Sequence, residues 1–248
     1  MKVIFLGTAG YVPTEDRHTN CILIKDLNLI LDAGSGFFRF PKFINPTELH
    51  ILLSHFHMDH IGGLTQLKGL LRDKKTKVVN IYGHTGIKKA VTGMFSPPYF
   101  ALPLEKHPFK ILLKEVGNSK FSINGAKIIS KVFPHSNPRF SVGYRIEYKG
   151  KVVTFVTDTI ISNKQKDFVR NSDLLIHEAY YPKGYEEPAK REWHSITANV
   201  AKLAKETGCK KLALYHFNRR FDPKLFDKEA KEIFSNSLLP EDLTEITV

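Results

Sequence analysis

The sequence predicts an α/β fold in which strands and helices alternate along a single domain, residues 1–248. Two observations carry this prediction. Short apolar runs recur along the whole chain, and segments with helical spacing follow several of them. No linker, low-complexity run or short repeat divides the sequence, and its length suits one α/β domain with a well-formed core.

The predicted elements follow one another closely along the chain. Apolar runs with the length and composition of strands occur at residues 3–6, 21–24, 29–32, 49–54, 78–83, 127–133, 151–157, 173–178 and 211–216. Segments with helical spacing occur at residues 61–72, 86–95, 163–171, 196–207 and 223–235. In the fourth of these helices, Ser195 is placed to cap the start and Gly208 to end it. The stretch YKGK at 148–151 predicts a hairpin, so the sheets are expected to be mixed rather than purely parallel.

Composition excludes several classes of protein. The 42% hydrophobic and 25% charged fractions argue against disorder, and no apolar run approaches the roughly 20 residues that span a bilayer. The opening MKVIFLGTAG has too short an apolar core for a secretory signal and is interpreted as a first strand. Cys21 and Cys209 lie far apart and imply no disulfide framework, so a cytoplasmic protein without a membrane partner is expected.

Two further features leave their meaning open. The formal net charge of +12 is compatible with an anionic partner such as RNA, and equally with scattered lysines that keep the protein in solution. The segment 94–108 is rich in proline and aromatic residues, and it predicts a surface loop that forms a rim or a subunit contact.

The strongest chemical signal is LLSHFHMDHIGGL at residues 52–64. The histidines begin where an apolar strand stops, and His55 and His57, two residues apart on extended backbone, point to the same side. Asp59 and His60 then come from the start of the next helix, where Gly62 and Gly63 allow close backbone packing. One ion cannot easily take all four groups from so short a segment. Two neighbouring ions can, with His55 and His57 on the first and Asp59 and His60 on the second.

The rest of the chain offers the missing ligands in a repeated format. His135, Asp158 and His216 each stand at the trailing end of an apolar strand, which is where open α/β sheets place their ligand sites. We expect His135 to complete the first site, His216 to complete the second, and Asp158 to bridge both ions. A nitrogen-rich set with carboxylates and no cysteine favours two divalent cations, zinc before manganese or iron.

At these residues the sequence resembles the metallo-β-lactamase superfamily, whose hallmark is His-x-His-x-Asp-His. The resemblance extends from FLGTAGYVPT to YHFNRRF and is closest to the ribonuclease Z branch and its small phosphodiesterase relatives. LLIHEAY, with Glu178, is similar to that branch's His-Glu-Ala-Thr motif, although Tyr180 replaces threonine. WHSITA, with His194, is similar to its His-Ser-Thr motif, although Ile196 stands at a position where a hydroxyl residue is usual. The resemblance implies a four-layer αβ/βα sandwich of two mixed sheets, with the dinuclear site at one edge.

The residues and the resemblance together suggest phosphodiester hydrolysis by a hydroxide that two metal ions share. His194 is the candidate that protonates the leaving group, with Glu178 orienting its ring as in that branch. Asp59 is expected to bind metal and to steer the nucleophile. The resemblance makes Asp32 a structural support beside the site and not a ligand. A homodimer is expected by analogy with relatives.

The tRNA-processing enzymes carry a long arm between the equivalents of His135 and Asp158, and here a plain hairpin at residues 141–156 fills most of that interval. The interval between His60 and His135 holds ordinary strands, helices and the proline-rich loop. A small or cyclic phosphodiester is therefore the favoured substrate. The alternatives are a tRNA 3′-end endonuclease acting on an RNA 3′ end, a thioester or lactone hydrolase that would not need the pair of His194 and Glu178, and an inactive binding protein of the same fold.

Overall fold

The computed structural model describes residues 1–136 and 140–248. In the described residues the strands form two seven-stranded sheets. In spatial order, the first sheet contains β14 (Glu245–Thr247), β1 (Lys2–Gly7), β2 (Cys21–Ile24), β3 (Leu29–Leu31), β4 (Glu48–Leu52), β5 (Val78–Gly83) and β6 (Lys110–Glu115). The second contains β13 (Ser237–Leu238), β12 (Leu212–Tyr215), β11 (Leu174–Glu178), β10 (Lys151–Val156), β9 (Phe140–Tyr148), β8 (Ala126–Pro134) and β7 (Ser119–Ile123).

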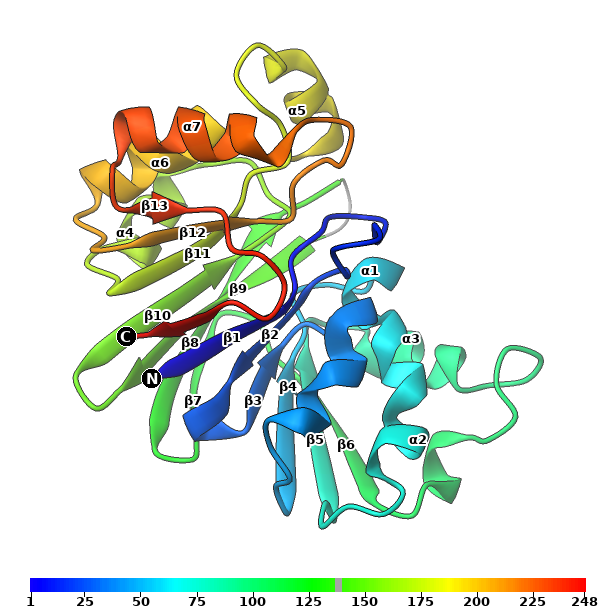
Figure 1. Cartoon of the computed structure of the whole chain (residues 1–248). Helices are drawn as coiled ribbons and strands as arrows, with labels where there is room; N and C mark the ends of the chain where they lie inside the picture. Colours follow the sequence, from blue (N-terminus) through cyan, green and yellow to red (C-terminus); the bar gives the residue numbers. More distant parts are fainter. Residues whose placement is uncertain (137–139) are drawn as a thin grey trace.

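Both sheets are mixed, as the hairpin at 148–151 predicts. In the first sheet the successive neighbours β3, β4, β5 and β6 are parallel, and in the second sheet β10, β11, β12 and β13 are parallel. All other neighbouring strands pair antiparallel. Lys149 and Gly150, with φ of 50° and 73°, make the two-residue turn between β9 and β10. The terminal strands β1 and β14 pair with each other, so the two ends of the chain lie side by side (Figure 1).

Helices cover the outer faces of the two sheets (Figure 1). They are α1 (Met58–Ile61), α2 (Leu67–Leu71), α3 (Ile87–Met94), α4 (Asn163–Val169), α5 (Glu186–Glu192), α6 (Thr197–Glu206) and α7 (Pro223–Ile233). Short 3-10 segments are η1 (Lys25–Leu27), η2 (Ser35–Lys42), η3 (Gly62–Gln66) and η4 (Leu104–Lys106). The first three α-helices pack on the first sheet and α4, α6 and α7 on the second.

Three apolar layers hold these elements together. The central layer lies between the sheets and includes Phe5 from the first and Phe155 from the second, both fully buried. A second layer joins the first sheet to its helices through residues such as Ile51 and Leu64. A third joins the second sheet to its helices through residues such as Val200. This is the four-layer αβ/βα sandwich that the family resemblance implies, because each sheet buries one face on the other sheet and one on helices.

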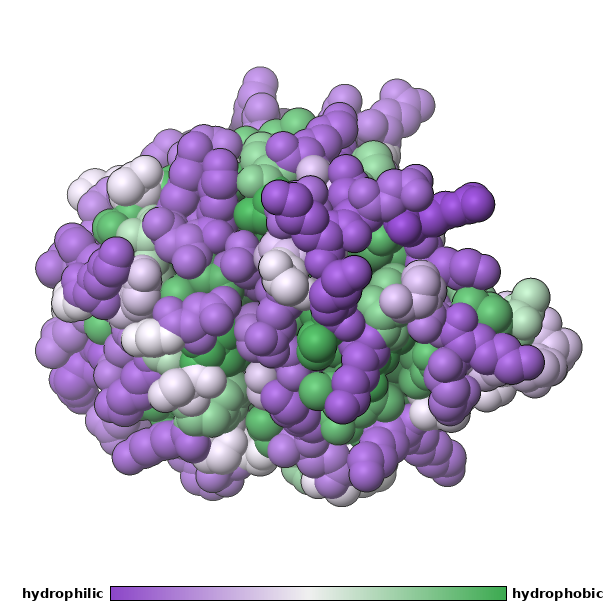
Figure 2. Space-filling model, turned by 90° about the horizontal axis from the view of Figure 1, so that it is seen from below, coloured by the Kyte–Doolittle hydropathy of each residue, from purple (hydrophilic) through white to green (hydrophobic). Residues whose placement is uncertain are grey.

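The surface agrees with the composition. Hydrophilic side chains predominate on the face drawn in Figure 2, with apolar ones showing between them. No helix in residues 1–136 and 140–248 is long and apolar enough to cross a membrane. Cys21 and Cys209 are free and buried, as the absence of a disulfide framework requires. Residues 95–109 connect α3 to β6 through η4, and Tyr99 within them is 81% exposed, so the predicted surface loop is confirmed.

Two local predictions are wrong. The helix expected at 61–72 is instead the last residue of α1 followed by η3 and α2, and Gly63 within η3 packs closely on Gly34 and Phe37. Ser195 does not cap α6: Ile196 occupies the cap position, and the Ser195 hydroxyl instead donates to the Thr159 carbonyl at 2.6 Å. That bond ties the chain before α6 to the segment after β10.

We expect Gly63→Ala to destabilise the protein, because an added Cβ would overlap the Gly34 carbonyl oxygen and come within 2.6 Å of the Phe37 Cβ. A cost of about 1–3 kcal/mol lowers the melting temperature by several degrees in a protein of this size. Gly69→Ala in α2 is the matched control, since nothing lies within 4 Å of its added Cβ. A calorimetric scan that finds both variants equally stable would contradict the close packing.

Candidate metal centre

All seven predicted ligands gather at one edge of the sandwich, where β4, β8, β10 and β12 end (Figure 1). The chain turns sharply there. Asp158 and His216 have left-handed backbone, with φ of 47° and 52°, just beyond β10 and β12. Such residues are uncommon outside glycine, are enriched in Asp and His, and persist only where the surrounding structure fixes them. Each of these two strands therefore ends one or two residues before the residue that carries the polar side chain.

The first cluster consists of His55, His57 and His135. The His55 Nε2 and His57 Nδ1 atoms lie 2.9 Å apart, and the His135 ring centroid is 5.0 Å and 5.2 Å from those of His55 and His57. His135 is 3% exposed, yet neither of its ring nitrogens has a hydrogen-bond partner among the described residues. A buried imidazole in this state is destabilising unless its nitrogen binds another group, and a cation between the three rings would supply one.

The second cluster consists of Asp59, His60 and His216, with Asp158 against it. The His60 Nε2 atom lies 3.2 Å from both Asp59 Oδ2 and Asp158 Oδ2. The His216 Nε2 atom lies 3.3 Å from Asp59 Oδ2 and 3.4 Å from Asp158 Oδ1. One ligand atom from Asp158, one from His60 and one from His55 also lie within 4.8 Å of one another, so Asp158 stands between the two clusters.

These spacings fit a small divalent cation. Nitrogen and oxygen ligands of zinc lie about 2.0–2.2 Å from the ion, so two ligands at a tetrahedral angle are about 3.4 Å apart. The distances among His60, His216 and the two carboxylates match that separation. His60, His55 and Asp158 are all buried, so the acceptor atoms are also shielded from water.

Asp32 supports the site from behind, as the resemblance implies. Its Oδ2 atom lies 2.7 Å from His60 Nδ1 and accepts from the Ser54 hydroxyl at 2.8 Å, and its Oδ1 accepts from the Ser54 backbone at 2.7 Å. This leaves His60 Nε2 facing the two other carboxylates. A carboxylate that holds the far nitrogen of a ligand histidine is the usual second layer of a metal site.

The charges of the cluster suit metal binding. Burial, followed by the nearby His135, lowers the pKa of His57 to about 4, so its imidazole is neutral at neutral pH. Burial raises the pKa of Asp59, but His60 and His216 outweigh it and hold that pKa well below its usual range. For His60, burial lowers the pKa and the surrounding Asp59, Asp158 and Asp32 raise it well above its usual value. Neutral histidine and ionised aspartate are the forms that bind cations, so His57 and Asp59 are already in those forms, whereas His60 must release its proton when a cation binds.

The predicted pair of Glu178 and His194 lies beside Asp158. Glu178 ends β11 and is fully buried, and its carboxylate lies 3.1 Å from His194 Nδ1 while accepting from the Thr159 backbone at 2.8 Å. The His194 Nδ1 atom is 3.9 Å from Asp158 Oδ1. Burial lowers the pKa of His194, but Glu178 and then Asp158 raise it to about 9. The imidazole is therefore protonated at neutral pH in the absence of metal.

Asn20 and Tyr11 contact the site although no sequence pattern predicts it. The Asn20 side-chain amide lies 2.9 Å from His60 Nε2 and 3.3 Å from Asp59 Oδ2, and the backbone of Tyr11 donates to the same carboxylate at 3.0 Å. Tyr180, known from the sequence only as a departure from the family motif, stacks on His194 with ring centroids 4.2 Å apart. These contacts come from segments that neither spacing nor periodicity links to the histidines.

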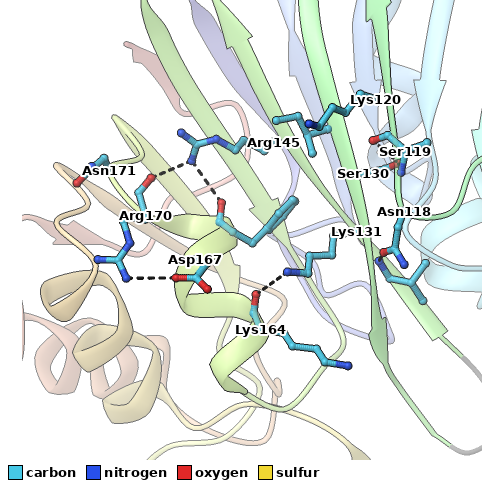
Figure 3. Close-up of a pocket in the computed structure, with 13 residues that line it drawn as sticks. Asn118, Ser119, Lys120, Ser130, Lys131, Arg145, Lys164, Asp167, Arg170 and Asn171 are labelled. Atoms are coloured by element: carbon cyan, nitrogen blue, oxygen red, sulfur yellow. Dashed lines mark hydrogen bonds and ion pairs between the residues drawn. The ribbon is translucent and has the colours of Figure 1, made fainter.

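The remaining histidine and arginine candidates are placed apart from the ligands. His177 is buried, with Nδ1 donating to the Glu178 carbonyl at 2.8 Å, and so packs as the sequence suggests. His84 lies in the turn after β5 against Phe56. Arg145 does not line the metal cluster: it lies in a cavity on the outer face of the second sheet, where it donates to the carbonyls of Phe168 and Arg170 (Figure 3).

The family model for the beta-lactamase superfamily domain matches residues 28–217. The match covers most of the chain and includes every predicted ligand. This protein belongs to that family.

Relatives of the chain agree with the match. Ribonuclease Z of Streptococcus uberis is 25% identical over 316 aligned positions that cover all of both chains, and ribonuclease Z of Streptococcus equi subsp. equi is 24% identical with the same coverage. Among solved structures, the metallo-beta-lactamase fold protein YhfI of Bacillus subtilis has a TM-score of 0.81 at 22% identity, covering 99% of each chain. Human tRNase Z, short form, has a TM-score of 0.78 at 20% identity, covering 100% of this chain and 99% of its own.

The fold, the family and the His/Asp groups at the strand ends together define a metal-dependent hydrolase.

We expect the purified protein to contain two divalent ions per chain and His135→Ala to contain about one, because His135 contacts the first cluster and not the second. Elemental analysis after dialysis measures this directly. His107→Gln is the control, a buried histidine in the segment before β6. If His135→Ala keeps both ions with unchanged affinity, His135 is not a ligand.

Proposed function

We propose that this protein hydrolyses phosphodiesters with two divalent cations, and that its substrate is a small or cyclic phosphodiester. The observation that carries the proposal is the buried Glu178 next to His194, 3.1 Å apart and directly beside Asp158. Hydrolysis of a phosphodiester expels an alkoxide, which needs a proton. A protonated imidazole held in one orientation at the edge of the cluster is suited to provide it.

The roles of the residues follow from their positions. We assign His55, His57 and His135 to the first ion and Asp59, His60 and His216 to the second, with Asp158 shared. When bound, such a pair lowers the pKa of a shared water toward neutrality and offsets charge on the phosphoryl oxygens. Zinc suits this set of nitrogen and carboxylate ligands best, and manganese or iron are the other candidates.

Asp59 has a second role in this proposal. Its Oδ2 atom faces His60, His216 and the Tyr11 backbone, so the carboxylate is fixed at the mouth of the second cluster. A fixed carboxylate there can accept a hydrogen bond from the attacking water and so orient it. His194 donates to the leaving oxygen, and Glu178 keeps its Nδ1 proton engaged so that Nε2 is the donating atom.

The connection between β8 and β10 supports a small substrate. Apart from residues 137–139, the interval from His135 to Asp158 is occupied by β9, a two-residue turn and β10. The alignment with the streptococcal ribonuclease Z runs over 316 positions against 248 residues here, so 68 aligned positions have no residue in this chain. The described residues therefore contain no arm at this position that grips a large RNA.

The deciding experiment compares a chromogenic phosphodiester, a 2′,3′-cyclic nucleotide and a precursor tRNA, each with added zinc or manganese. We expect the small esters to be cleaved more efficiently than the tRNA. Precursor tRNA cleaved far more efficiently than both small esters would overturn this preference and favour a tRNA 3′-end endonuclease.

The alternative is a thioester or lactone hydrolase of the same fold. Such an enzyme would not need the pair of His194 and Glu178 to protonate an alkoxide that leaves phosphorus. We expect His194→Ala to lower kcat on the phosphodiester by about 10²–10⁴-fold with both ions retained, because general acid catalysis contributes that much. Metal content and turnover are measured on the same sample. Glu178→Gln should give a smaller loss, since the ring remains but is less firmly held. An unaffected rate in His194→Ala would favour acyl-ester hydrolysis.

One observation favours RNA as a second candidate substrate. A cavity of about 1010 Å³ lies on the outer face of β7, β8 and β9 beside α4 (Figure 3). Its lining includes five cationic side chains, Lys120, Lys131, Arg145, Lys164 and Arg170, and the carboxylate of Asp167, which is paired with Arg170 at 3.3 Å. Lys131 lies four residues before His135, about 13 Å along the strand at 3.3 Å per residue. An RNA strand with its end at the metals can therefore reach these cations.

This candidate predicts that Lys120→Glu with Lys164→Glu weakens binding of a single-stranded RNA oligonucleotide about tenfold at low salt and reduces the salt dependence, because fewer phosphates are neutralised. Hydrolysis of the chromogenic ester should stay unchanged. Lys88→Glu with Lys89→Glu on α3 makes the same change of charge on the other sheet's helices and is the control. Equal effects of the two pairs in a filter-binding titration would show that only net charge matters.

The homodimer and the cytoplasmic location expected from the sequence stay predictions. The segment 94–108, with its exposed Tyr99, is the proposed dimer contact. Analytical sedimentation of a Tyr99→Ser variant would test it.

A further inference from the structure

A small aromatic pocket opens directly beside the first metal cluster. It has a volume of about 310 Å³ and is lined by Phe56, His84 and Phe140 together with the predicted ligands His55 and His57. We call these five residues the aromatic pocket. Its volume is at the lower end of the range for small-molecule sites, about 300–1,000 Å³. A group bound there touches the side chains that hold the first ion.

The walls of the pocket are already in place. The Phe56 ring lies over the His84 ring, with centroids 4.1 Å apart and an angle of 33° between the planes. Gly83 permits this arrangement, because a Cβ at that position would lie 3.0 Å from Phe56 Cε1. Both rings are only partly buried. The wall formed by Phe56 and His84 is thus held in place by the packing of Phe56 on Gly83 and His84.

Phe140 supplies the other wall. It begins β9 and pairs in register with Pro134, the residue before His135. Its side chain is 48% exposed, although most large apolar side chains of this protein are buried. Met58, between His57 and Asp59 in the chain, is 63% exposed, and Tyr11, whose backbone donates to Asp59 of the second cluster, is 71% exposed. Apolar rings left open at the mouth of a polar centre are suited to contact a ligand.

The chemistry of the lining selects a flat heterocycle. Stacking on aromatic faces is favourable for every nucleobase. The His84 Nδ1 atom donates to the Thr85 carbonyl at 2.7 Å, so a neutral His84 keeps a lone pair on Nε2 that can accept from a base N–H. Among the described residues no lysine or arginine lines this pocket, so the described lining offers no cation to a second phosphate.

We propose that the aromatic pocket binds the nucleobase of the substrate, which makes the small phosphodiester of the proposed function a nucleoside phosphodiester. This inference rests on the proposed function for the phosphate, whose place is at the metals. The base then sets the affinity, and the metal centre carries out the hydrolysis. Phe140 and Phe56 are specificity residues in this account and take no part in proton transfer.

The test uses two substrates that share a five-membered cyclic phosphate and differ in the nucleobase and sugar: adenosine 2′,3′-cyclic phosphate and glycerol 1,2-cyclic phosphate. We expect Phe140→Ala to raise KM for the adenosine compound about tenfold with kcat within twofold, as base–aromatic stacking warrants. For the glycerol compound, kcat/KM should stay within twofold. Phe140→Trp should restore the KM for the adenosine compound, because the ring face is retained.

Phe38→Ala is the matched control, since it removes a partly exposed phenylalanine ring from η2 and does not line the pocket. Thermal melting establishes that all three variants are folded. If Phe140→Ala changes the kinetics of both substrates equally, or of neither, the aromatic pocket does not bind the base.

A binding measurement separates this inference from the proposed function. Calorimetric titration of the metal-loaded protein with adenosine 3′-phosphate and with glycerol 2-phosphate needs no turnover. We expect the nucleotide to bind more tightly, and Phe140→Ala to abolish most of the difference. If neither cyclic ester is hydrolysed but the nucleotide still binds more tightly than glycerol 2-phosphate, the proposed function is wrong and base binding in the aromatic pocket is supported. If both esters are hydrolysed and the two ligands bind the parent protein equally, the pocket fails alone.

Discussion

Everything in the candidate site depends on the environment of His60. Its Nδ1 atom lies 2.7 Å from Asp32, and its Nε2 atom lies 3.2 Å from both Asp59 and Asp158. His60 and Asp32 are fully buried and Asp158 is 2% exposed. Gathering carboxylates out of water around one imidazole is costly unless positive charge balances them. In the proposed site divalent cations would provide that balance, and Asp32 holds the Nδ1 side of His60 so that Nε2 faces the other carboxylates.

The two sheets bring this environment about. Parallel pairing from β3 to β6 and from β10 to β13 places the carboxyl ends of strands at one edge of the sandwich, where β4 delivers His55 to His60 and β10 and β12 deliver Asp158 and His216. The left-handed backbone at Asp158 and His216 is local strain that the buried core beneath them can hold. The same edge also carries Glu178 from β11. The family's chemistry is therefore a consequence of where its strands end.

That the seven proposed ligands gather in one place could be predicted from the sequence, because each follows an apolar run and such runs are typical of buried strands. Most strands were predictable for the same reason. The exceptions are β6 and β7, where polar and charged residues interrupt the apolar pattern on half-exposed strands, and the short terminal strands β13 and β14, of two and three residues. The break in the helix predicted at 61–72 and the bond of Ser195 to Thr159 were not predictable. Both arise from contacts between segments distant in sequence, which override local preference.

The surroundings of the metals were also beyond the sequence. Asn20 and the backbone of Tyr11 reach Asp59 through the fold of the loop after β1, and no spacing marks them. Phe56 occupies an unspecified position of the hallmark motif, and its role as a wall appears only when Gly83 and His84 are brought against it. The residues that we propose as ligands are thus marked in the sequence by the motif and by the ends of apolar runs, whereas those that we propose to contact the substrate depend on tertiary packing.

The most direct test of the central claim is X-ray absorption at the metal edge of the protein loaded with zinc. If the His and Asp clusters hold a pair of ions that share one site, the spectrum contains a nitrogen and oxygen shell at about 2.0–2.2 Å and a metal–metal scattering path at about 3.5–4 Å. The intensity of the first shell should require imidazole ligands. A spectrum of isolated, largely hydrated zinc with no metal–metal path would contradict a dinuclear centre at this edge of the sheets.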